Sequence, residues 1–192
     1  MTQEELQRTF IAFREECIWL RNCYNTYAAL FESGEDTSRL LHQTAAHFFH
    51  DLNRILIEYV ILQACKITDP AKFRKRDNLT VATLNIALKR RGLLTEEIRE
   101  HSKGVMRYRD FLADARNRLI SHLDMETVLN MGALGEHSKE DVSSFFDSLQ
   151  EYCDAVGNVV GVGPLDFRCS PGRGDVIDLV SVLRREDGPD RP

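Results

Sequence analysis

Arg116 and His122 are the residues whose types and spacing could best carry out chemistry in this chain. They lie on either side of Leu119, which belongs to the apolar seam of a predicted helix. At about 100° per residue, each lies roughly 60° from that seam, so both side chains can point towards the packing partner of the helix. A histidine there can transfer a proton, and an arginine can bind an anion. Asn117 falls on nearly the opposite side of an ideal helix.

The same pair has a purely structural interpretation. A histidine and an arginine near the C-terminus of a helix interact favourably with its macrodipole without taking part in any reaction. The spacing therefore leaves both interpretations open.

Basic residues gather in one part of the chain. The stretch 66–118 contains 14 Lys and Arg against 7 Asp and Glu, within a chain of net charge −5. The overall acidity argues against a protein that coats nucleic acid non-specifically, whereas the local excess favours a contact with a polyanion. With interleaved aromatic side chains, the stretch could guide single-stranded RNA, or it could be an ordinary solvated surface. The residues concerned are Phe73, Arg74–Arg76, Lys89–Arg91, Arg107, Tyr108 and Arg109.

A second constellation allows a metal alternative. His47, His50 and Asp51, with His42 nearby, have spacings that can bring imidazoles and a carboxylate to one helix face. No matching His/Glu pair occurs on another predicted helix, so a polar interface is the other interpretation of these residues. The main prediction includes no metal and no cofactor.

Helical periodicity and capping signals cover almost the whole chain and have to position these residues. We expect helices from Thr2 to Gly34, from about Ser38 to Thr68, from Thr80 to Gly92, from Thr95 to about Ser121, from Ser138 to Gly161 and from Val176 to Arg185. We expect loops over 70–78 and 125–136, and a disordered charged tail.

The apolar stripes of the two long helices define the predicted core. In the first helix they comprise Leu6, Phe10, Phe13, Cys17, Leu20, Tyr24, Tyr27 and Phe31. In the second they comprise Leu41, Ala45, Phe48, Leu52, Leu56, Tyr59, Leu62 and Cys65.

These patterns predict an all-α fold, an up-and-down bundle of about five to six helices. We expect the bundle to cover 1–162, followed by a C-terminal extension over 163–192 with a short helix. No apolar run is long enough to span a bilayer, and the acidic start lacks the features of a signal peptide, so we expect a cytoplasmic protein with no membrane contact.

Arg116-Asn117 followed by His122 resembles the Arg-x(4–6)-His signature of the HEPN superfamily. The order of other segments narrows the resemblance. Thr68-Asp69-Pro70 ends a long helix, Asp77-Asn78-Leu79-Thr80 opens a short one, and the motif helix ends in Ser-His-Leu-Asp. Over about residues 41–124 this order is similar to that of AbiU-type abortive-infection HEPN proteins.

The resemblance implies a dimer in which two such motifs face each other across a cleft. It implies a metal-independent endoribonuclease of a defence or toxin–antitoxin system, with RNA as substrate and an antitoxin or regulatory protein as partner. The implied roles are proton transfer by His122, phosphate binding by Arg116, orientation by Asn117, and RNA binding by Arg107, Arg109 and Arg118. The alternative is a non-catalytic HEPN module for interaction or for binding RNA or nucleotide.

Overall fold

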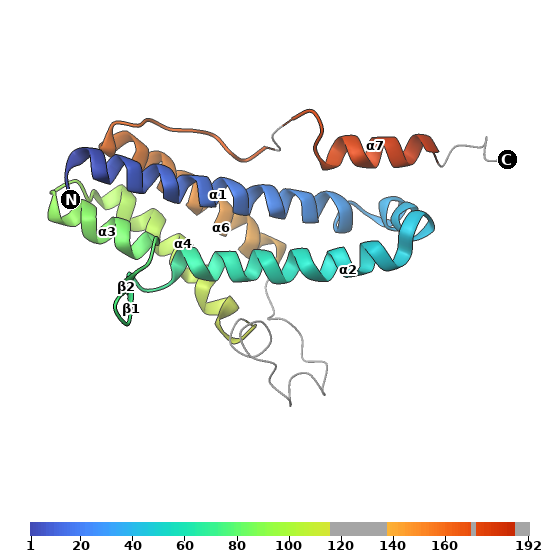
Figure 1. Ribbon diagram of the computed structural model, residues 1–192, viewed down its shortest axis with the longest axis horizontal. Helices are drawn as coiled ribbons and strands as arrows, with labels where there is room; N and C mark the ends of the chain where they lie inside the picture. Colours follow the sequence, from blue (N-terminus) through green and yellow to red (C-terminus); the bar gives the residue numbers. More distant parts are fainter. Residues whose placement is uncertain (116–137, 170–171, 187–192) are drawn as a thin grey trace. The chain divides into compact units, whose positions relative to one another are not determined.

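The computed structural model describes residues 1–115, 138–169 and 172–186, and it confirms the all-α class (Figure 1). Six helices and one two-stranded hairpin make up the described residues. The helices are α1 (Gln3–Phe31), α2 (Glu35–Thr68), α3 (Val81–Arg90), α4 (Glu96–Ala115), α6 (Lys139–Val160) and α7 (Val176–Glu186), and the strands are β1 (Lys72–Phe73) and β2 (Arg76–Asp77).

Side-chain caps fix the helix starts that the sequence predicts. The Thr2 hydroxyl accepts a hydrogen bond of 3.1 Å from the Glu5 amide, and the Glu5 carboxylate accepts one from the Thr2 amide. Ser138 and Asp141 form the same reciprocal box at the start of α6. Thr80 caps α3 by accepting from the Thr83 amide at 3.3 Å. Each cap satisfies amides that have no partner within the helix, so each start is confirmed.

α2 differs from its prediction in two ways. It begins at Glu35, ahead of Ser38, and it is interrupted at Ala45, whose φ of −162° and ψ of 71° are non-helical. The interruption turns the second segment relative to the first, so a single apolar stripe cannot run through both. The prediction that Phe48 belongs to the core is therefore wrong, because its side chain is 60% exposed while Phe49 is 6% exposed.

The stretch between α2 and α3, predicted as a loop, contains a short hairpin. Lys72 pairs with Asp77 and Phe73 with Arg76 in an antiparallel register. Arg74, in the turn, has a φ of 55°, in the left-handed region. Strands of two residues are too short to show alternation in a sequence.

The chain divides into two compact units. The first comprises Met1–Trp19 and Ile61–Arg168, and the second comprises Leu20–Val60 and Cys169–Pro192. Residues 163–168, assigned by sequence to the C-terminal extension, pack within the first unit. There the buried Gln150 side chain donates to the Leu165 carbonyl and accepts from the Phe167 amide, each at 3.0 Å.

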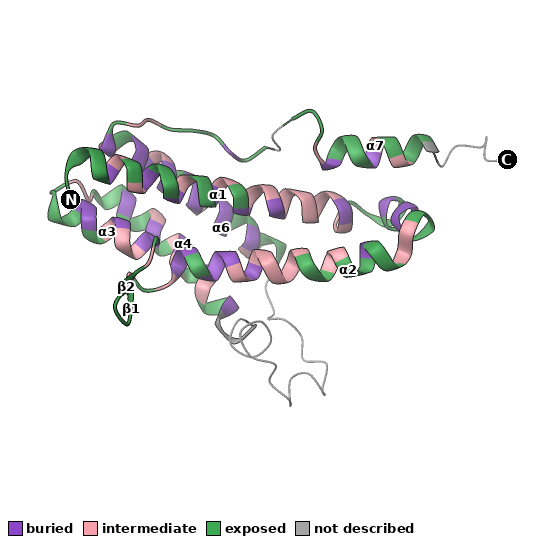
Figure 2. Ribbon diagram, in the orientation of Figure 1, coloured by how far each residue is buried: buried purple, intermediate pink, exposed green. Residues whose placement is uncertain are grey.

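Each unit has its own apolar core (Figure 2). In the first unit, Phe10, Phe13, Phe145, Phe146 and Tyr152 are almost completely buried. In the second unit, α7 packs on the helical hairpin made by the end of α1 and the start of α2. That smaller core contains Leu30, Leu41, Phe49, Val176 and Val180. The buried stripe of α1 passes through Cys23 and Leu30, whereas the predicted Tyr24, Tyr27 and Phe31 are half-buried.

Candidate functional site

The predicted catalytic residues Arg116, Asn117 and His122 lie outside the described residues, as does Arg118. The structure does describe the helix that leads into them. α4 ends at Ala115, which immediately precedes Arg116. The elements that hold α4 therefore position the start of this segment of the chain.

α4 packs closely along α6 in the first unit. The rings of Tyr108 and Phe145 are stacked, with centroids 4.6 Å apart and planes inclined by 27°. One turn later on α4, Leu112 is 1% exposed. Rings stacked at this separation fix the position of one helix against the other and also bury apolar surface. The end of α4 therefore has a defined place against α6.

A glycine allows this close approach. A Cβ placed on Gly104 of α4 would lie 2.9 Å from the Cβ of Ser148 on α6, and closer still to its hydroxyl oxygen. Near the start of α4, His101 Nδ1 lies 3.1 Å from a carboxylate oxygen of Glu151. The contacts between the two helices thus extend over most of the length of α4.

The two described arginines among the predicted RNA-binding residues lie in different surroundings. Arg107 is exposed. The guanidinium of Arg109 lies 3.7 Å from a carboxylate oxygen of Asp69, and the two side chains are 33% and 20% exposed. Residues two positions apart are separated by about 200° around the helix axis, so the side chains of Arg107 and Arg109 leave the helix in different directions.

Asp69 is a neighbour of α4 that the sequence does not reveal. In the sequence, Asp69-Pro70 is a stop signal for the helix before it and part of the family resemblance, and neither indicates a contact with Arg109. The structure shows that the Asp69 carboxylate also ties the end of α2 to α4. A single negative charge just ahead of a basic stretch was the signal that could have found it.

The prediction that Tyr108 belongs to an RNA-binding surface is wrong. The sequence predicts that Tyr108, like Phe73, can stack on RNA bases. Its side chain is only 6% exposed and its ring packs on Phe145, so no base can stack on it. Phe73, at 65% exposed, keeps its accessible ring.

The metal alternative finds no support in the described residues. Within 1–115, 138–169 and 172–186, no group of three or more His, Cys, Asp or Glu side chains is arranged to hold a metal ion. His47 and Asp51 are exposed on α2. His42 and His50 instead line a pocket of the second unit.

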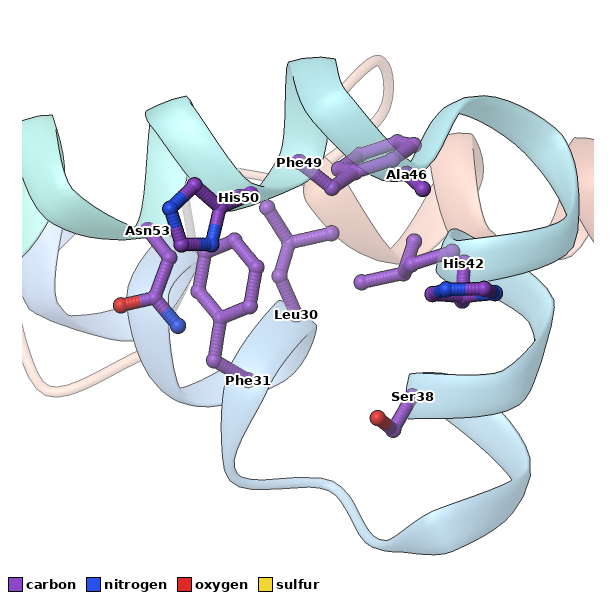
Figure 3. A pocket seen from close by; sticks show the side chains of 9 residues that line it. Leu30, Phe31, Ser38, His42, Ala46, Phe49, His50 and Asn53 are labelled. Carbon is purple, nitrogen blue, oxygen red and sulfur yellow. The ribbon is translucent and has the colours of Figure 1, made fainter.

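That pocket is an open hollow of about 230 Å³, between the end of α1 and the first half of α2. Figure 3 shows His50 close to Phe31 and Asn53, with His42 and Ser38 near the other end. Its floor is apolar, and its polar groups are spread around the rim rather than converging on one point. The arrangement contains no acid/base pair with a shared target.

Among the residues that the structure describes, the strongest pKa shifts belong to buried core groups. Burial raises the pKa of the Tyr152 hydroxyl well above its usual range. Burial, and then the neighbouring Cys153, raise the pKa of the Cys17 thiol in the same direction. A raised pKa keeps a thiol or a phenol neutral and therefore unreactive.

Comparison with known proteins identifies the family. The family model described as AbiU2, a HEPN family, matches residues 3–178, which is nearly the whole chain. No curated protein and no solved structure matches the chain. No helix in the described part of the chain has the length and apolar character needed to cross a membrane. The match over residues 3–178, together with the all-helical fold, establishes that the chain belongs to the AbiU2 family of HEPN-type, abortive-infection proteins.

Proposed function

We propose that this protein is a metal-independent endoribonuclease whose cleft is formed by Arg116 and His122 of two subunits. The observation that carries the proposal is the position of the Arg116-Asn117-x4-His122 motif in a chain of this family. The motif directly follows α4, a helix that is packed on α6 along most of its length. The expected role is defence in the cytoplasm, under the control of an antitoxin or a regulatory protein.

The chemistry needs no metal, because RNA carries its own nucleophile. The 2′-oxygen attacks the adjacent phosphorus as it loses its proton, and the bond from phosphorus to the 5′-oxygen breaks as that oxygen gains one. His122 handles a proton at one of these two oxygens, and its counterpart in the second subunit serves the other. Arg116 binds the phosphate and stabilises the charge that develops on it. The products are a 2′,3′-cyclic phosphate and a 5′-hydroxyl.

The described residues support this proposal through preorganisation. Charge stabilisation is effective only where the charged group is held in place before the reaction. The Tyr108–Phe145 stack and the Arg109–Asp69 ion pair hold the last two turns of α4 ahead of Arg116. The exposed Arg107 adds positive charge that attracts RNA.

Growth on induced expression tests this function in cells. The wild-type protein should arrest growth, and His122→Ala and Arg116→Ala should each restore it at equal protein levels. Lys103→Gln is the matched control, because Lys103 is an exposed residue of α4 that pairs with Glu100. Its expression should arrest growth as the wild type does. Arrest by His122→Ala, or harmless wild-type protein, would favour the non-catalytic module instead.

A further inference from the structure

The hairpin between α2 and α3 presents a concentrated set of cations around an exposed aromatic ring. We call residues 72–77 the basic hairpin; its cations are Lys72, Arg74, Lys75 and Arg76, and its one acid is Asp77. Every residue in it is exposed, and Figure 2 shows it accessible along its length. In Figure 1 it projects away from the helices next to it. Its chemistry is suited to a flexible polyanion that also carries flat rings.

The base of the basic hairpin is closed by hydrogen bonds. The Asn78 amide donates to the Ala71 carbonyl, and the Asn78 side chain donates to the Pro70 carbonyl, each at 2.8 Å. Lys72 Nζ lies 3.3 Å from a carboxylate oxygen of Asp77 across the strands. The tip is therefore held on a closed support, which lowers the entropy cost of binding there.

A cation occupies the turn position, where glycine or asparagine would fit the backbone better. Arg74 has a φ of 55°, a left-handed conformation that glycine or asparagine adopts at less cost. Its guanidinium lies 5.3 Å from the centre of the Phe73 ring. A planar guanidinium beside an exposed ring provides two flat surfaces for a base and several donors for phosphate.

The basic hairpin is connected, within the first unit, to α4, the helix that ends just before the motif. Its first strand follows shortly after Asp69, whose carboxylate pairs with Arg109 of α4. From Arg109 to Ala115, the last residue before the motif, is about 9 Å along the helix axis. An RNA strand bound at the hairpin is thus bound to the same unit as the end of α4.

We propose that the basic hairpin is a binding site for single-stranded RNA, which it holds for cleavage. A base stacks on Phe73, and Arg74, Lys75 and Arg76 contact the neighbouring phosphates. The RNA must be single-stranded, because a base inside a duplex has no free face to offer. This inference rests on the proposed function for its purpose, but binding at the hairpin and cleavage at the motif can be measured separately.

The test is fluorescence anisotropy with a labelled, unstructured RNA oligonucleotide, using the full chain carrying His122→Ala so that no RNA is cut. In this background Phe73→Ala should weaken binding roughly tenfold or more, the usual effect of losing a stacked base. Phe73→Tyr should bind within about twofold of the parent, because it keeps the ring. Arg74→Asn keeps a residue that tolerates the turn and should lower the slope of log K against log salt by about 0.7.

Arg8→Gln is the matched control, since it removes one exposed positive charge from α1 of the same unit. It should leave affinity and salt slope unchanged. The proposal is overturned if the parent binds no RNA, or if Phe73→Ala and Arg74→Asn bind as tightly as the parent. Displacement of RNA by an equimolar acidic peptide would also overturn it, in favour of a protein-docking surface. If the hairpin binds RNA as expected but the wild-type protein does not cleave it, the binding site is supported and only the proposed nuclease function is contradicted.

Discussion

The Asp69 carboxylate and the Arg109 guanidinium approach to 3.7 Å and tie the end of α2 to the second half of α4. Asp69 also immediately precedes the segment that carries the basic hairpin. One ion pair therefore connects the proposed RNA-binding element to the helix that leads into the motif. Both side chains are partly exposed, so we expect the pair to fix geometry more than to add stability.

A double-mutant cycle measures that stability. Asp69→Asn, Arg109→Gln and the combined variant should give a coupling free energy of at most about 1 kcal/mol in urea unfolding, because solvent and salt screen a partly exposed pair. The coupling should decrease further at high salt. A coupling above about 2 kcal/mol that persists in salt would show that the pair is a main source of stability.

The Tyr108–Phe145 stack should matter far more to the free energy of unfolding. Phe145 is 2% exposed, and Phe145→Ala should cost about 3–5 kcal/mol because it removes a buried ring and leaves a cavity. Phe73→Ala is the matched control: the same substitution at a 65% exposed residue should cost less than about 0.5 kcal/mol. Equal losses in chemical unfolding would contradict the packing described for α4 and α6.

Gly104 should be required for the close contact between α4 and α6. Alanine usually stabilises a helix relative to glycine by up to about 1 kcal/mol, but here its Cβ would meet Ser148. We expect Gly104→Ala to destabilise the protein by about 1–3 kcal/mol through overpacking. Ser148→Gly removes the obstructing atoms. In a Ser148→Gly background, Gly104→Ala should therefore cost much less free energy of unfolding than it does in the wild-type protein. Thermal unfolding of the four proteins would show whether it does.

Helix ends with a side-chain cap or a terminal glycine were the most predictable part of the fold, because a few local atoms determine them. Thr80 and Ser138 begin helices with their own side chains, and Gly92 and Gly161 end them at φ values of 70° and 79°. The interruption at Ala45 could not be predicted in this way. Alanine favours helix, and neither glycine nor proline marks the position, so the cause lies in packing beyond the local sequence.

The candidate site shows the same division. Arg116 and His122 were proposed from a short motif together with the order of the segments before it, and they stay a prediction. The Asp69–Arg109 pair joins residues forty positions apart and depends on the tertiary fold. Tyr108 was different, since a signal was present. It lies three residues after Val105 and four before Leu112, both buried, so helical periodicity assigns it to the core in spite of its arginine neighbours.

Tyr152 should make the free energy of unfolding decrease at alkaline pH. Its hydroxyl lies 3.0 Å from the Asn85 side-chain oxygen, and burial raises its pKa well above the usual value near 10. In the unfolded chain the phenol ionises near pH 10, whereas in the folded protein it stays neutral. The contribution of Tyr152 to the free energy of unfolding is therefore complete below about pH 10. It is lost as the pH rises towards the folded pKa, by up to about 1.4 kcal/mol per pH unit.

Tyr152→Phe should remove that part of the pH dependence at a cost of about 1 kcal/mol at neutral pH, the usual value of one hydrogen bond. Unfolding followed at a series of pH values from neutral to above 10 would compare the two proteins. If the free energies of unfolding of the two proteins fall in parallel above pH 10, Tyr152 ionises in the folded state as easily as in the unfolded one.

Cleavage of end-labelled RNA in the presence of EDTA tests the central claim most directly. Purified wild-type protein should cut the RNA and leave 2′,3′-cyclic phosphate ends, and His122→Ala should leave it intact. EDTA removes divalent ions, so cleavage under these conditions requires no metal. If the folded wild-type protein leaves the RNA intact, or if His122→Ala cuts it equally well, then Arg116 and His122 do not form the proposed nuclease site.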